Sequence, residues 1–83
     1  MSSRPDAYTY TVVLERDTEA GGFVAICPAL PGVVTEGETI EEAREMARDA
    51  IRGYLESLQK DGLAIPTEDE PIVSPIRVEL THL

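Results

Sequence analysis

The side chains of this sequence that could do chemistry are one cysteine, one histidine and a set of carboxylates. Cys27 ends a run of apolar residues, where a thiol behaves as a small hydrophobic group and not as a nucleophile. His82 has no second histidine or cysteine beside it to complete a metal site. We therefore expect no catalytic residue, no metal site and no cofactor.

The carboxylates are also poorly placed for metal-dependent phosphodiester hydrolysis. That reaction needs several carboxylates that project together and hold two metal ions about 4 Å apart. The strand centres predicted below carry apolar or aromatic residues instead: Tyr10, Val12, Val24, Ile26 and Val34. A metal-dependent nuclease is therefore only a remote alternative.

The acidic residues at the ends of the predicted elements are candidates for binding a partner. They are Glu15, Asp17, Glu19, Glu36 and Glu38. The same residues also suit a solvated loop, and acids just before a helix complement its dipole. Both interpretations stay open at this point.

The charge of the chain points to a cationic partner. Its 83 residues include 16 acidic and 7 basic side chains, which give a net charge of -9. A surface of this sign repels phosphate backbones and speeds the encounter with a basic protein. We expect no direct binding of nucleic acid.

The length and composition indicate one folded domain over residues 1–83, with 42% hydrophobic residues. No apolar run approaches the roughly 18 residues of a membrane span, and the N-terminus lacks an apolar signal-peptide core. A single cysteine cannot form an intramolecular disulfide. We expect a cytoplasmic location and no membrane partner.

Three strands are predicted in the first half of the chain. Residues 8–15 alternate between two faces, and Gly21 and Gly22 favour a hairpin turn after them. Residues 23–27 are apolar at every position and form the second strand. Proline and glycine in 30–33 suit a type II turn, which leads into a short third strand over 33–36.

One long helix is predicted over residues 39–60. Thr39 and Glu42 have the spacing of a capping box, and Asp61 with Gly62 supplies the stop. The solvated side carries three arginines, each three residues after an acid, which leaves that side nearly neutral. These pairs are Glu41 with Arg44, Glu45 with Arg48, and Asp49 with Arg52.

A last strand is predicted near the C-terminus, where Ile76, Val78 and Leu80 alternate with polar residues after a proline-rich connection over 63–75. The fold class is α+β with the order βββαβ. It is a small, mainly antiparallel sheet with one long helix on one face.

A single helix covers only one face of such a sheet, yet the second strand is apolar on both faces. The residues expected on the uncovered face are Val13, Val24, Ile26 and Val34. Soluble monomers seldom expose such a patch, so we expect a homodimer or a dimer of dimers. The competing possibility is that the connection over 63–75 folds back and covers the patch within one chain.

The middle of the chain resembles the HicB-like antitoxin family over about residues 8–66. The resemblance rests on an ordered set of motifs: Gly-Phe-Val-Ala at 22–25, Pro-Ala-Leu-Pro-Gly at 28–32, Glu-Gly-Glu-Thr-Ile-Glu-Glu-Ala at 36–43, and Lys-Asp-Gly at 60–62.

This resemblance implies a partial RNase H-like fold without catalysis, and neutralisation of HicA, a small basic mRNA-cleaving toxin of type II toxin-antitoxin systems. Members of the family commonly carry a DNA-binding segment after this domain. The predicted last strand uses the residues after Pro75, so we expect no such segment here. A stand-alone, self-associating domain with a regulatory or unknown role is the alternative.

Overall fold

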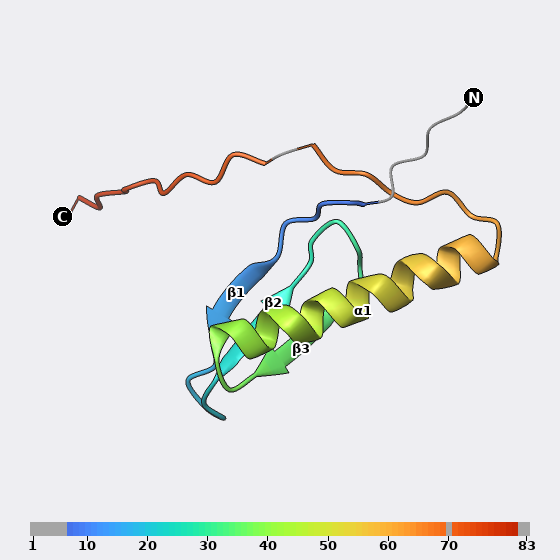
Figure 1. The fold of residues 1–83 in the computed structure, drawn as a ribbon. Helices are drawn as coiled ribbons and strands as arrows, with labels where there is room; N and C mark the ends of the chain where they lie inside the picture. The colour runs from blue at the N-terminus through green and yellow to red at the C-terminus, as the bar shows by residue number, and fades with distance from the viewer. Residues whose placement is uncertain (1–6, 70, 82–83) are drawn as a thin grey trace.

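A computed structural model describes residues 7–69 and 71–81 and shows an α+β fold (Figure 1). The elements are β1 (Val13–Arg16), β2 (Phe23–Ile26), β3 (Val34–Gly37) and α1 (Ile40–Lys60). The strands form one antiparallel sheet in the order β1-β2-β3, and α1 lies across one face. The predicted fold class is confirmed. His82, interpreted above as no metal ligand, lies outside the described residues.

The hairpin between β1 and β2 is organised by Asp17. Its side-chain Oδ1 accepts the N–H groups of Glu19 and Ala20, both at 3.0 Å. Gly21 and Gly22 follow with φ of 80° and 78°, which are left-handed values that favour glycine. The chain therefore reverses tightly and begins β2 at once.

The loop between β2 and β3 contains the predicted type II turn. The Val33 N–H donates to the Leu30 carbonyl at 3.1 Å, and Gly32 has a φ of 94° at the position where this turn requires a positive value. The Cys27 N–H donates to the Val33 carbonyl at 3.2 Å and closes the base of the loop. Leu30 is 0% exposed, so this loop contributes to the core.

Both ends of α1 carry the predicted caps. Thr39 Oγ1 accepts the Glu42 N–H at 3.0 Å, and Glu42 Oε1 accepts the N–H of Glu38 at 3.1 Å, one residue before the cap. At the other end Gly62 has a φ of 70°, and the Leu63 N–H donates to the Leu58 carbonyl at 2.8 Å. These bonds satisfy backbone groups that a helix end leaves unpaired.

The buried side chains that pack against α1 become larger from its start to its end. At the start of the helix the core is built from Ala25, Ala43 and Ala47, while the far half packs around Cys27, Leu30 and Val33. A Cβ on Gly37 would lie 2.8 Å from the Ala43 Cα, so β3 and α1 are in backbone contact there. Small residues thus hold one end of the helix close to the sheet.

The first strand is shorter than predicted, since β1 begins at Val13 and residues 8–12 are not part of it. The register pairs Val13 with Ile26, the last residue of β2. Beyond that pair the segment after β2 reaches Pro28, which has no N–H to donate, and then enters the loop that leads to β3. The sheet therefore has no partner for residues 8–12 at this end.

The prediction of a last strand over 76–80 is wrong for the single chain. Residues 71–81 contain no strand and lead away from the sheet (Figure 1). Ile76, Val78 and Leu80 are 83%, 73% and 84% exposed. The alternating pattern is present, but a strand also requires a hydrogen-bonded neighbour, and this segment has none in the described chain.

We predict that Gly37→Ala lowers the free energy of unfolding by about 1–3 kcal/mol, because the new methyl group would overlap the α1 backbone. Gly53→Ala is the matched control, since nothing lies within 4 Å of its Cβ position in the helix. It should raise stability by about 0.5–1 kcal/mol. Urea unfolding measures both, and equal effects of the two variants would contradict the close contact.

Candidate partner-binding surface

The face of the sheet opposite α1 carries an apolar row that crosses all three strands. The register aligns Val13 of β1, Ile26 of β2 and Val34 of β3 side by side. Val13 is 41% exposed and Val34 58%, whereas Ala25 on the helix-covered face is fully buried. We call this row, with the row described next, the open face.

The second row of the open face places Val24 between two carboxylates. Glu15 of β1 and Glu36 of β3 are both register partners of Val24. Since neighbouring strands lie about 4.8 Å apart, the two glutamates flank a gap of about 10 Å with an apolar floor. All four residues predicted for self-association therefore share one face with two of the predicted partner-binding acids.

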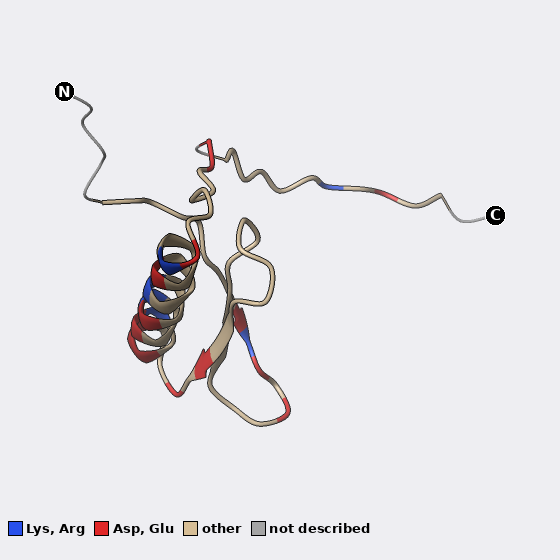
Figure 2. Cartoon of the chain, turned by 90° about the vertical axis from the view of Figure 1, so that its right-hand side faces the viewer, with Lys and Arg blue, Asp and Glu red and all other residues tan. Residues whose placement is uncertain are grey.

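The other three predicted acids follow β1 and β3 at the end of the sheet where the register aligns Arg16, Phe23 and Gly37. Figure 2 shows acidic stretches in the hairpin and in the turn that leads into the helix. Glu19 is in the exposed hairpin turn, and Glu38 precedes the helix. A Cβ on Gly22 would meet the Gly37 carbonyl oxygen at 2.5 Å and the Glu38 Cα at 3.3 Å, so the end of the hairpin packs on the backbone just before α1. Asp17 differs from them, since its carboxylate already accepts two backbone N–H groups of the turn.

Arg16 lies on the helix side of the sheet, away from the carboxylates of the open face. It pairs with Phe23 across the strands, and its guanidinium carbon lies 5.2 Å from the centroid of the Phe23 ring. Residues 15 and 16 point to opposite faces of a strand. The arginine therefore covers the ring on the helix side, and Glu15 lies on the open face.

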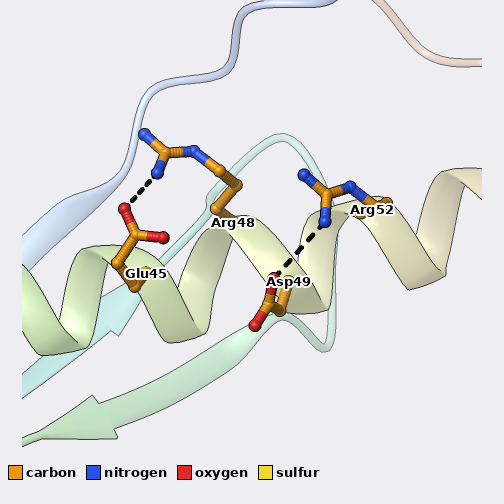
Figure 3. Close-up of polar contacts among 4 residues, drawn as sticks. All are labelled: Glu45, Arg48, Asp49 and Arg52. Atoms are coloured by element: carbon orange, nitrogen blue, oxygen red, sulfur yellow. Dashed lines mark hydrogen bonds and ion pairs between the residues drawn. The ribbon is translucent and has the colours of Figure 1, made fainter.

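The solvated side of α1 carries two of the three predicted ion pairs (Figure 3). Arg48 pairs with Glu45, and Arg52 lies 3.6 Å from Asp49. Within the described part of the chain Arg44 has no carboxylate within 4.0 Å, so the predicted pair with Glu41 is not formed. These pairs are exposed and contribute little to stability.

Sequence reasoning missed a groove of about 380 Å³ between α1 and the chain that enters β1. Val12, Leu14 and Ile51 supply its apolar part, and Arg44 and Arg48 line it from the helix, together with Tyr8, Thr9 and Tyr10. The available signal was the long alternation over residues 8–14. The apolar side of this stretch is larger than the surface that the alanine-rich start of α1 can cover.

Among the described residues two titratable groups have a shifted pKa, and both pack against the core around Leu30. Burial raises the pKa of the Cys27 thiol, which is 2% exposed, and burial likewise raises the pKa of the Tyr10 hydroxyl. The Tyr10 hydroxyl donates to the Pro66 carbonyl oxygen. The Cys27 thiol is therefore held in its unreactive neutral form, as expected of a packing residue.

Over residues 7–69 and 71–81, no group of three or more His, Cys, Asp or Glu side chains is arranged to hold a metal ion. In the same part of the chain, α1 is too polar to cross a bilayer. The candidate surface is the open face, where Val13 and Val34 are exposed and Glu15 and Glu36 lie on either side of Val24.

Comparison with known proteins agrees with the motifs. The sequence profile of a family described as "HicB_like antitoxin of bacterial toxin-antitoxin system" matches residues 10–77. This chain belongs to the HicB-like antitoxin family. The match includes β1, β2, β3 and α1 and continues after the helix as far as residue 77.

Individual relatives support the assignment to the HicB-like family. A UPF0150 protein of Synechocystis is 42% identical over 86% of this chain and 87% of its own length. A UPF0150 protein of Thermoplasma acidophilum is 45% identical over 72% of this chain and 86% of its own. Antitoxin HicB 1 of Photorhabdus laumondii is 44% identical over 69% of this chain, which spans 36% of that longer protein.

We predict that Cys27 of this HicB-like chain reacts with thiol reagents at least about a hundredfold more slowly in the native state than in urea, since reaction requires opening of the core. The raised pKa also means that the folded state keeps a proton that the unfolded state loses. The free energy of unfolding should therefore fall as the pH rises above about 9. Rapid native labelling, or stability that rises with pH in this range, would contradict the burial.

Proposed function

We propose that the chain acts as an antitoxin that binds and neutralises a small basic mRNA-cleaving toxin of the HicA type. The observation that carries the proposal is the open face, in which the apolar row of Val13, Ile26 and Val34 borders a second row flanked by Glu15 and Glu36. Membership of an antitoxin family and the net charge of -9 support the same role.

The two rows would contribute differently to such a complex. Burial of the apolar row supplies affinity that salt does not weaken, while the acidic border speeds the encounter with a cationic surface. A toxin that cleaves RNA needs cationic side chains for the phosphate backbone. Carboxylates docked against those side chains would compete with RNA for them, which neutralises the toxin without any catalytic step.

Self-association is a second candidate, and the same face favours it. Val13 and Val34 are exposed beside Ile26, and two copies could cover each other's rows about a two-fold axis. A homodimer or a dimer of dimers formed in this way would compete with a toxin for the open face. A short basic toxin-like reading frame beside the gene would favour the antitoxin role over a stand-alone one.

We predict that Glu15→Lys with Glu36→Lys slows association with the cognate toxin by about tenfold at low salt, because these charges border the contact. The matched control is Glu41→Lys with Glu56→Lys, which changes the net charge equally on the helix. Stopped-flow association rates across a salt series measure the effect. Equal slowing by both pairs would show that only net charge acts, and would remove the open face as the contact.

We further predict that Ile26→Asp weakens toxin binding at least about tenfold, because it places a charge in the middle of the apolar row. Ile40→Asp is the control, since Ile40 is an exposed residue at the start of α1. Isothermal titration at high salt isolates the apolar contribution. Unchanged affinity of Ile26→Asp would exclude the apolar row from the complex.

A further inference from the structure

The C-terminal segment has the pattern of a strand without the neighbour that a strand needs. Ile76, Val78 and Leu80 occupy alternate positions, so they would share one side of an extended strand, and they are 73% to 84% exposed. Arg77, Glu79 and Thr81 would occupy the other side of that strand. A segment that is apolar on one side and polar on the other is suited to lie at the edge of a sheet, with its apolar side inward.

The sheet offers such a position next to β1. Within the described residues β1 pairs only with β2, so its outer edge has unpaired backbone groups. Beside this strand lies the groove under α1, with Val12, Leu14 and Ile51 in its apolar part. A fourth strand here would gain hydrogen bonds from the edge of β1 and bury its apolar side chains in the groove.

The tail of the same chain is poorly placed to fill this position. Its connection is fixed beside the entry to β1, where Glu68 Oε1 accepts the Thr11 N–H at 2.8 Å. From Glu68 to Ile76 an extended chain spans about 26 Å, whereas Thr11 to Arg16 spans only about 17 Å. A tail that stayed fully extended along β1 from this anchor would pass the end of its own sheet before its apolar residues began.

Residues 71–81 contain no turn that would bring the tail back to its own sheet. Pro75 biases Ser74, the residue before it, toward extended backbone and away from a helical conformation. The tail accordingly extends away from the body of its own chain (Figure 1). Its apolar side is thus available to a second molecule, while the groove of its own chain stays open.

We propose that residues 76–80 of one chain add as a fourth strand to the outer edge of β1 in a second copy, with Ile76, Val78 and Leu80 seated in the groove beneath α1. The exchange is reciprocal in a two-fold dimer. It deepens the self-association proposed above but uses residues outside the open face, so the two contacts can be tested separately.

Light scattering on the full chain tests the exchange. The wild type should have twice the mass of the 9.1 kDa chain, and Val78→Asp should raise the dimer dissociation constant at least about tenfold. Thr81→Asp is the matched control, because it adds the same charge on the polar side of the tail and should leave the mass doubled. A monomeric wild type, or equal loss from both variants, would overturn the exchange.

The same measurement distinguishes the exchange from the open face. A dimer that is insensitive to Val78→Asp but dissociated by Ile26→Asp would refute the exchange and leave self-association through the open face standing. Loss of the dimer in Val78→Asp with retained toxin binding would support the exchange and leave the antitoxin proposal unaffected.

A mixed sample tests whether the strand comes from the other chain. One copy carries Glu79→Cys with a nitroxide attached and has no isotope label; the buried Cys27 does not compete for the reagent. This copy is mixed with an isotope-labelled wild-type copy. Exchange predicts broadening of the Val12 and Leu14 amide signals in the labelled copy. A second sample carries the nitroxide and the isotopes on the same chain. Broadening in that sample alone would show that the tail folds back, and would refute the proposal.

Discussion

The close approach of α1 to β3 at Gly37 is the contact on which the rest of the structure depends. Without a side chain at Gly37, the helix backbone at Ala43 packs directly on the strand. The contact is reinforced by the Thr35 hydroxyl, which donates to the Ala43 carbonyl at 3.3 Å. It fixes the helix over β2 and β3 and leaves the helix-facing side of β1 as the wall of a groove.

Features with local causes could be predicted from the sequence. The cap at Thr39, the stop at Gly62 and the turn around Gly32 each depend on a few adjacent residues, and all three have the expected hydrogen bonds. The open face also followed from local alternation, because a strand that is apolar on both sides must leave one side uncovered by a single helix. Family membership followed from the order of these same motifs.

Features that depend on distant partners could not be predicted in the same way. The length of β1 is limited by Pro28, which follows the neighbouring strand β2, and the alternation of residues 8–15 contains no information about that residue. The alternation at 76–80 predicted a strand that the described chain does not contain, because the pattern does not specify a hydrogen-bonded neighbour. Asp17 was identified as an acid of interest, yet its role in the hairpin is set by backbone groups that only the folded turn brings near.

The two connections of the sheet differ in what they would tolerate. The loop from β2 to β3 buries Leu30 and Val33 in the core, so added residues there would displace the packing beneath α1. The hairpin from β1 to β2 keeps Thr18, Glu19 and Ala20 exposed, and its tip carries no core residue. An affinity tag or fluorophore-binding peptide inserted at this tip would leave the fold intact, and would stand beside the acidic end, where it could report on an approaching partner.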